Sequence, residues 1–119
     1  MTTMELSESA VDGVRVLSVE GEVDLSTSPR FGAVLERLAA AAAGPLVVDL
    51  TRCSFIDSSG LAALLHGAGH RDDFSIVGGT GAPGEVLRIT AIDQTVPVFE
   101  VLAEALTAAG RRRSFRLSQ

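Results

Sequence analysis

The chain has 119 residues, 46% hydrophobic and 21% charged, which suits one folded domain with a single core rather than a disordered chain. Its net charge of −5 is unevenly spread, because residues 1–110 carry six basic and fifteen acidic side chains while four of the ten arginines lie within residues 111–116. An acidic body without tryptophan or tyrosine repels phosphate backbones and offers few stacking surfaces, so we expect no nucleic-acid partner.

The first half of the chain predicts a β-hairpin, a helix and a buried strand. Residues 4–10 alternate in polarity, the turn-forming pair Asp12-Gly13 follows, and residues 14–24 are rich in β-branched side chains. Ser28-Pro29 predicts a helix start with Ser28 as N-cap, and the helix should end at Gly44-Pro45. Its apolar face is predicted to consist of Phe31, Val34, Leu35 and Leu38. The run LVVDL, residues 46–50, is typical of a strand buried on both faces.

The second half alternates helices with strands. We predict a helix over 58–69, a strand over 74–78, a short helix over 83–91, a strand over 96–99 and a last helix over 100–109. The resulting order, β-β-α-β-α-β-α-β-α, predicts an α/β fold. Its mixed β-sheet should contain an N-terminal hairpin and then parallel βα units, packed with about four helices. We expect one domain over 1–110 and a basic, flexible C-terminal tail over 111–119.

The sequence indicates a soluble protein of the cytoplasm. Residues 1–9 lack the basic and apolar regions of a signal peptide, and the apolar run 38–48 is too short to span a bilayer, so we expect no membrane partner. The single cysteine, Cys53, excludes an internal disulfide and a multi-cysteine metal site, and favours a reducing compartment. We expect Cys53 to be a buried small residue in a loop before Phe55.

The stretch FIDSSGLAALLH, residues 55–66, places two serines at a predicted helix start. With Asp57 as N-cap, Ile56 and Leu61 have the spacing of a hydrophobic staple. Ser58 and Ser59 then lie in the first turn, where unpaired N–H groups and the helix dipole would accept an added phosphate, although capping alone would also explain the motif. A helical wheel makes Ser59 slightly the more exposed serine. The buried stripe is predicted to be Leu61, Leu64, Leu65 and Ala68.

Three other chemistries are weakly supported by the sequence. A serine hydrolase lacks both the G-x-S-x-G elbow and a histidine placed as base. The loop Gly79–Gly84, GTGAPG, matches G-x-G-x-x-G with Glu100 downstream, but Pro83 removes an N–H donor and the following helix is short. His66 and His70 are four residues apart, but they lack the glutamate of H-E-x-x-H and are expected to be surface residues at a fraying helix end. We therefore expect no cofactor, no metal and no catalytic residue.

Several of these stretches together resemble the STAS domain, specifically the bacterial anti-anti-sigma factors, also called anti-sigma factor antagonists. They are GEVD at 21–24, LVVDL followed by CSFIDSSGLAALL, and the closing VFEVLAEAL, and the resemblance covers about residues 6–109. It implies that Ser58 is phosphorylated by the partner, an anti-sigma factor serine kinase with an ATP-binding fold. It also implies a partner switch: the unphosphorylated antagonist holds the kinase and releases a sigma factor, and a metal-dependent serine phosphatase resets it. The residues implied to border the partner are Asp24, Asp57, Ser59, Gly60 and Leu61.

Two alternative functions are compatible with the same sequence. The first is a STAS scaffold subunit of a larger signalling or transport complex, in which the serine is never modified. The second is a nucleotide-binding protein that uses the loop Gly79–Gly84. The sequence also departs from the family pattern near the expected partner surface, because Ala62 stands where glycine is common and the segment HGAGHRDD before the next strand is short.

Overall fold

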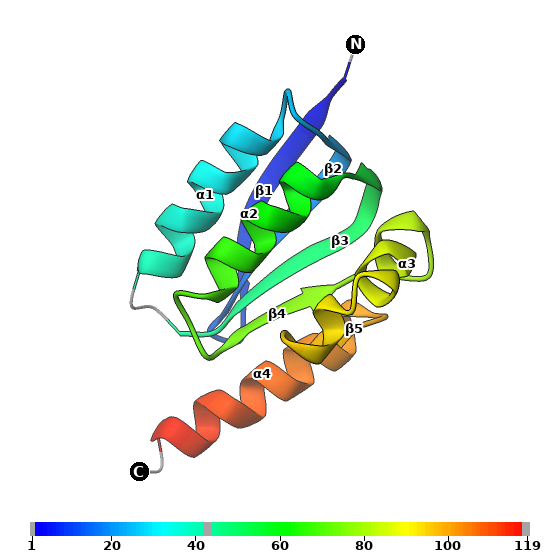
Figure 1. Ribbon diagram of the computed structural model, residues 1–119. Helices are drawn as coiled ribbons and strands as arrows, with labels where there is room; N and C mark the ends of the chain where they lie inside the picture. Colours follow the sequence, from blue (N-terminus) through cyan, green and yellow to red (C-terminus); the bar gives the residue numbers. More distant parts are fainter. Residues whose placement is uncertain (1, 42–43, 118–119) are drawn as a thin grey trace.

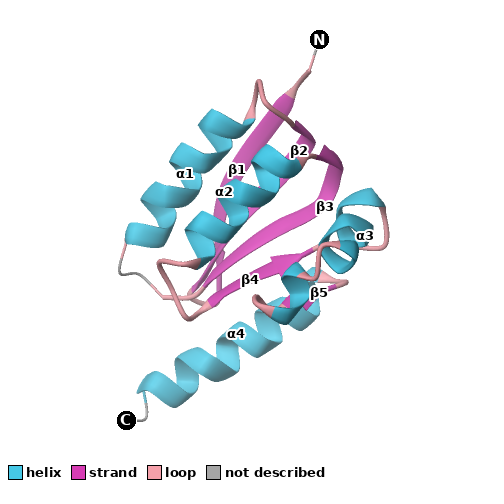
Figure 2. Ribbon diagram, in the orientation of Figure 1, coloured by secondary structure: helices cyan, strands magenta, loops and turns pink. Residues whose placement is uncertain are grey.

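The computed structural model describes residues 2–41 and 44–117, with side chains described as far as Arg111 (Figure 1). In these ranges five strands form one sheet in the order β1-β2-β3-β4-β5 (Figure 2). The pair β1–β2 is antiparallel, and all later neighbours are parallel. The strands are Met4–Val11, Val14–Val23, Leu46–Ile56, Phe74–Val77 and Val98–Phe99. The predicted mixed α/β sheet with an N-terminal hairpin is confirmed.

Four α-helices connect and follow the strands in the described ranges. They are α1 Ser28–Ala40, α2 Ser58–Ala68, α3 Ala82–Ile89 and α4 Leu102–Leu117, with a 3₁₀ turn at Ile92–Gln94. Because each new parallel strand is added on the same side of the previous one, right-handed crossovers place α1, α2 and α3 on one face of the sheet. Figure 1 shows α1 and α2 side by side in front of the sheet. None of the helices described is both long enough and apolar enough to cross a membrane.

Each face of the sheet has its own apolar cluster. The larger cluster lies under α1, α2 and α3 and includes the predicted helix residues Phe31 and Leu35, both fully buried. The smaller cluster lies under α4, where Ala105 and Ala109 pack against four strand valines: Val14, Val16, Val47 and Val77. The run LVVDL is therefore buried from both sides, as its uninterrupted apolar pattern predicts.

The bounds of several elements differ from the predicted ones. The N-cap of α1 is Thr27 rather than Ser28, because the carbonyl of Thr27 accepts the first helical bond, from the amide N–H of Phe31 at 3.1 Å. The Thr27 side chain does not cap the helix, and its hydroxyl donates to the carbonyl of Glu22. Strand β3 continues six residues past Leu50 to Ile56, pairing there with β2 alone. This extension places Cys53 in a strand instead of a loop, although the cysteine is buried as expected. Residues 51–56 of β3 have only one neighbouring strand, so more of their side chains are exposed. This segment therefore has no continuous apolar pattern from which a strand could be predicted.

Helix α4 extends beyond its predicted end. It was expected to stop near Ala109 but continues to Leu117, through residues that were assigned to the tail. Arginine is a good helix former and a single Gly110 costs only about 1 kcal/mol, so the backbone has no strong reason to stop there. The side chains of residues 112–119 lie outside the described ones, and the domain boundary at residue 110 stays a prediction.

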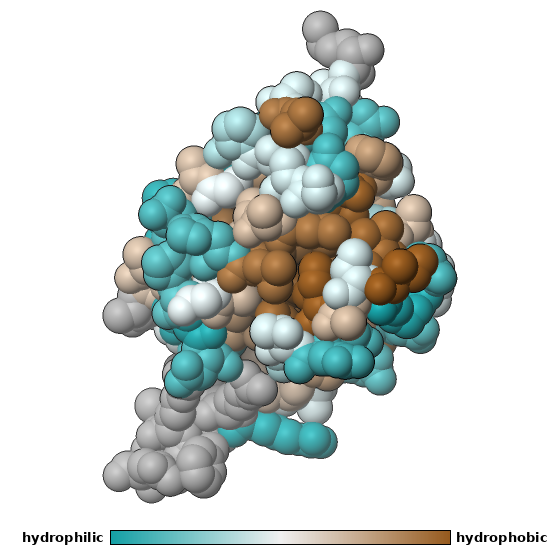
Figure 3. Space-filling model, viewed as in Figure 1, coloured by the Kyte–Doolittle hydropathy of each residue, from teal (hydrophilic) through white to brown (hydrophobic). Residues whose placement is uncertain are grey.

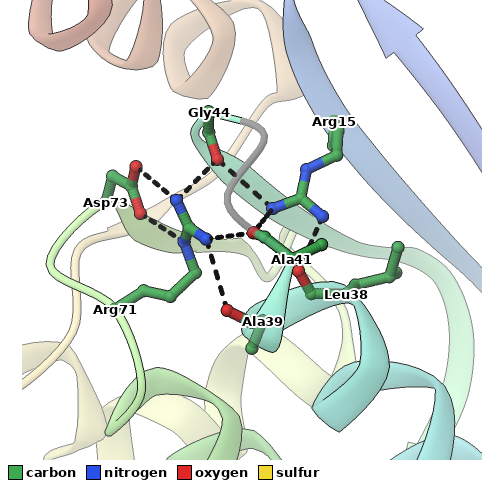
Figure 4. Close-up of polar contacts among 7 residues, drawn as sticks. All are labelled: Arg15, Leu38, Ala39, Ala41, Gly44, Arg71 and Asp73. Carbon is green, nitrogen blue, oxygen red and sulfur yellow. Dashed lines mark hydrogen bonds and ion pairs between the residues drawn. The ribbon is translucent and has the colours of Figure 1, made fainter.

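Two arginines bind the end of α1 and the connection from α1 to β3 (Figure 4). Arg71 forms a two-pronged ion pair with Asp73, with Nε–Oδ1 and Nη2–Oδ2 distances of 2.6 and 2.9 Å. Arg71 and Arg15 also donate to carbonyls that would otherwise lack helical partners. These carbonyls belong to Leu38, Ala39, Ala41 and Gly44, at donor–acceptor distances of 2.6 to 3.5 Å. The cluster ties the α1–β3 connection to the segment between α2 and β4.

Replacing Arg71 with alanine should destabilise the fold strongly. Its side chain is 12% exposed and that of Asp73 is 2% exposed, so the substitution breaks a buried pair, which costs about 3 kcal/mol. Chemical denaturation with urea measures the loss. Arg88→Ala is the matched control, because its pair with Glu85 is exposed on both sides and should be worth at most about 1 kcal/mol. Equal losses in the two variants would contradict a structural role for Arg71.

Candidate functional site

The candidate site lies where the carboxyl ends of β2 and β3 meet. These two strands are parallel neighbours, with Val23 paired to Ile56 at their ends. The amide N–H of Asp57 donates to the carbonyl of Val23 at 3.1 Å, so the two chains leave the sheet side by side. Asp24 therefore follows β2 at the same edge at which Asp57 follows β3 and Ser58 begins α2. In α/β sheets this edge is where binding sites are usually formed.

Asp57 is the N-cap of α2, as predicted. Its backbone is extended, and its Oδ1 accepts the amide N–H groups of Ser59 at 2.9 Å and Gly60 at 3.3 Å. The same oxygen accepts the Ser59 hydroxyl at 2.5 Å. These bonds favour the carboxylate, so the pKa of Asp57 is lowered, chiefly by the Ser59 hydroxyl, while the charge of Asp24 acts weakly in the opposite direction.

The two serines have different environments. Ser58 is exposed, and its hydroxyl makes no hydrogen bond within the described chain. Ser59 is partly buried, and its hydroxyl is committed to Asp57. The wheel-based prediction that Ser59 is the more exposed serine is therefore wrong. The helical wheel treats α2 as an isolated helix. In the structure the hydroxyl of Ser59 instead donates to the carboxylate of the N-cap residue Asp57, which reduces the exposure of Ser59. Ser58 is therefore the more exposed of the two serines.

Gly60 lets α2 start close to the sheet. A Cβ atom at this position would lie 2.6 Å from Cγ1 of Ile56 and 2.7 Å from Cγ1 of Val23, both shorter than a real contact allows. The absence of a side chain thus sets how near Ser58 comes to the strand ends. Farther along α2, Leu64 and Gly67 are buried, whereas Leu65 is 41% exposed. The prediction that Leu65 belongs to the buried stripe is wrong, because Gly67 takes that face against Leu35 and Phe74.

Asp24 organises the loop that precedes α1. Its Oδ1 accepts the amide N–H groups of Ser26 at 2.9 Å and Thr27 at 3.2 Å, and its Oδ2 accepts the hydroxyl of Thr2 at 2.9 Å. The pKa of Asp24 is lowered, chiefly by the hydrogen bond from the Ser26 hydroxyl. Two ionised carboxylates, Asp24 and Asp57, therefore lie on the edge that carries Ser58.

Two exposed apolar residues are close in sequence to the two aspartates. Leu25, which follows Asp24, is 79% exposed, and Phe55, two residues before Asp57, is 48% exposed. Figure 3 shows a further apolar area over α2 and α3, bordered by hydrophilic residues. Among the large hydrophobic residues, α2 exposes Leu65 and α3 exposes Ile89. A polar centre beside exposed apolar side chains is the composition of a protein-binding surface.

Among the described residues, neither histidine lies next to the serines of the site. His66 is on the same helix as Ser58 but eight residues farther along, which is about 12 Å along the axis. The Gly79–Gly84 loop follows β4, the next strand of the sheet, and Gly84 has a packing role. A Cβ at Gly84 would lie 2.3 Å from the carbonyl oxygen of Gly79, so the glycine permits α3 to approach that loop.

The two histidines are exposed, as predicted, but they have a neighbour that the sequence did not indicate. Glu36 of α1 lies next to them, so that one ligand atom from each of the three side chains is within 4.8 Å of the other two. Glu36 was missed because it precedes His66 by thirty residues, and only the packing of α1 on α2 brings the two together.

Comparison with known proteins identifies relatives of this arrangement. A family model described as "Mlab, STAS domain" matches residues 6–104. The anti-sigma-F factor antagonist RsfB of Mycobacterium tuberculosis is 31% identical over 99 residues, which cover 81% of each chain. The crystal structure of an anti-sigma factor antagonist from Mycobacterium paratuberculosis superimposes with a TM-score of 0.85 at 30% identity, covering 90% of this chain and 94% of the other.

The same fold occurs at lower identity. A STAS-domain anti-sigma-factor antagonist protein from Planctomyces limnophilus has a TM-score of 0.73 at 20% identity, covering 87% of this chain and 96% of that one. At this identity the likeness concerns the fold alone. The sheet order and the four helices described above are thus shared well beyond the sequences that resemble this one.

Replacing Gly60 with alanine should destabilise the chain and displace the start of α2. The added methyl group must push against two β-branched side chains, and such overpacking costs about 1 to 3 kcal/mol. Denaturation in urea measures the cost. Gly110→Ala is the matched control, because no described atom beyond its chain neighbours and the backbone of its own helix lies within 4 Å of its Cβ position, so it should be neutral or stabilising. A Gly60→Ala variant as stable as wild type would contradict the close approach of α2.

The cap at Asp57 should be lost in acid. Because the folded-state pKa of Asp57 is lowered, its stabilising effect is full above the unfolded value of about 3.9 and disappears as pH falls through the folded value. Asp57→Asn keeps an amide that can cap but carries no charge. Wild type should therefore be more stable than Asp57→Asn at neutral pH, and urea melts should show the difference shrinking as pH falls below about 4. A pH-independent difference would contradict the assignment.

Proposed function

The chain belongs to the STAS-domain family, and we propose that it is an anti-sigma factor antagonist controlled by phosphorylation of Ser58. With a free Ser58 hydroxyl it binds an anti-sigma factor serine kinase and thereby releases a sigma factor. With Ser58 phosphorylated it lets the kinase go, and a metal-dependent serine phosphatase restores the binding form. The proposed role is that of a binding module in the cytoplasm and not of an enzyme.

One observation carries this proposal: Ser58 is exposed at the first position of α2, while the neighbouring Ser59 is held by Asp57. A kinase needs a hydroxyl that can enter its active site, and Ser58 offers one on a rigid helix start. The relative at 31% identity is named as an antagonist of an anti-sigma factor, which supports the same class of partner. The exposed side chains of Leu25 and Phe55 beside the site supply apolar surface for that partner.

The switch follows from charge. Phosphorylation adds about −1.5 to −2 charges at neutral pH. On the free protein this charge stays in water at an exposed position, so the fold should change little. In the complex it would be desolvated against a surface that accepts a neutral hydroxyl, beside the carboxylates of Asp24 and Asp57. Asp24, Asp57, Ser59 and Leu61 are proposed to form the partner surface around Ser58. Gly60, also expected there, is buried against the strand ends, and its proposed part is to position the start of α2.

The proposal is tested with a cognate anti-sigma kinase and ATP. Mass spectrometry should find phosphate on Ser58 of the wild type, no phosphate on Ser58→Ala, and normal modification of Ser59→Ala. Ser58→Ala should bind the kinase and stay bound, and Ser58→Glu should bind at least about a hundredfold more weakly, or about 2.7 kcal/mol. Phosphate on Ser59 with Ser58 untouched would refute the assignment.

Two controls separate binding from folding. Ser54→Glu places the same charge on another exposed serine, on β3, and shows whether a general increase in negative charge weakens binding. Thermal melts should show that Ser58→Glu keeps a melting temperature near that of wild type, because the exposed side chain buries nothing. A folded Ser58→Glu variant that binds the kinase as tightly as wild type would contradict the proposed switch mechanism.

A further inference from the structure

We propose that Glu36, His66 and His70 form a binding site for a divalent transition-metal ion such as Zn²⁺, linking α1 to α2. The three side chains offer one carboxylate oxygen and two imidazole nitrogens, all mutually within 4.8 Å. Imidazole nitrogen and carboxylate oxygen are ordinary zinc ligands, and a set of three leaves a position for water. The site lies at the far end of α2 from Ser58 and does not depend on the proposed partner switch.

Helical geometry aligns the two histidines. They are four residues apart, the spacing that places side chains on one helix face. A helical turn continues past the end of α2, because the amide N–H of Gly69 donates to the carbonyl of Leu65 at 3.0 Å and that of His70 donates to the carbonyl of Gly67 at 3.2 Å. The imidazoles of His66 and His70 lie edge to face with ring centroids 5.0 Å apart. The glycine-rich HGAGH segment therefore keeps its two imidazoles together.

Close packing of the helices brings in the carboxylate. Leu35 of α1 faces Gly67 of α2, where a Cβ would lie 3.6 Å from that of Leu35. Glu36 follows Leu35 and His66 precedes Gly67, so both lie beside this contact. Gly32 is equally close to Ala63 one turn earlier, with a Cβ separation of 3.7 Å. Two small-residue contacts thus hold Glu36 within reach of the imidazoles without requiring the ligands themselves to be buried.

The ligand atoms are close to the separation that a metal needs. A tetrahedral ion with bonds of about 2.0 to 2.2 Å holds its ligand atoms roughly 3.4 Å apart. The longest separation here must therefore shorten by no more than about 1.4 Å, which rotation of exposed side chains permits. Within the described residues the side chains of Glu36, His66 and His70 make no hydrogen bond or ion pair, and the two imidazoles lie against each other. Their lone pairs are available to an ion.

Isothermal titration of the full-length chain, freed of any affinity tag, with ZnCl₂ tests the site. We expect one Zn²⁺ per chain, and no binding of Mg²⁺, which prefers an oxygen-only set. His66→Ala and His70→Ala should each weaken binding at least about tenfold, since even the outer partners of metal ligands are worth about 10- to 100-fold. Glu36→Gln should also weaken it. Failure of Zn²⁺ to bind, or equal binding by the double histidine variant, would overturn the proposal.

A control variant, thermal melts and the absorption of bound Co²⁺ distinguish binding at Glu36, His66 and His70 from metal binding elsewhere on the chain. Glu104→Gln removes an exposed helix carboxylate from α4 and should bind Zn²⁺ like wild type. Zn²⁺ should raise the melting temperature of wild type, because an ion that binds only the folded chain stabilises it, and should leave the double histidine variant unchanged. The absorption of bound Co²⁺ should show nitrogen and oxygen ligands. A thiolate charge-transfer band would place the ion on Cys53 and overturn the assignment.

Discussion

The parallel pairing of β2 with β3 is the constraint on which the rest of the site depends. It ends at Val23 and Ile56, so both strands leave the sheet at one edge. The bond from the Asp57 N–H to the Val23 carbonyl extends this pairing by one residue beyond the strands. The N-cap carboxylate then fixes the direction of α2, and Gly60 fixes its distance from the strands. The position of Ser58 is therefore determined by backbone bonds and one missing side chain, not by contacts of the serine.

Periodicity in the sequence was sufficient to predict most of the fold. The apolar spacing from Phe31 to Leu38 predicted α1, and the apolar, β-branched run at residues 46–50 predicted the centre of the sheet, where Leu46, Val47, Val48 and Leu50 are fully buried. Asp12-Gly13 predicted the hairpin turn, where both residues have positive φ, 50° and 81°. The strand extension through Cys53 was missed because a strand with one neighbour alternates less clearly between buried and exposed positions. Gly110 did not end α4, because arginine continues a helix readily.

Local sequence patterns predicted the N-cap of α2 at the candidate site, whereas the tertiary contacts of the site could not be predicted. Asp57 was identified as the N-cap because capping depends on residues adjacent in sequence. The relative exposure of the serines was predicted wrongly, since it depends on the bond from Ser59 to Asp57. Glu36 had no sequence signal, because His66 and His70 lie at least thirty residues away. Arg71 is close to Asp73 in sequence, but its bonds to the carbonyls at the end of α1 join residues about thirty positions apart and could not be predicted. Such pairs become visible only when the packing of α1 on α2 is known.

The magnitudes of the charges decide how the proposed phosphate acts. A helix N-terminus supplies only about half a positive charge, whereas a phosphoserine brings about −1.5 to −2. Asp24 and Asp57 are already ionised at the same edge, and their lowered pKa values keep them so at neutral pH. The helix dipole therefore cannot neutralise the proposed phosphate on Ser58, and we expect the free protein to tolerate the modification because this position is exposed to water. Binding removes that water, and the repulsion that water had screened then opposes the complex.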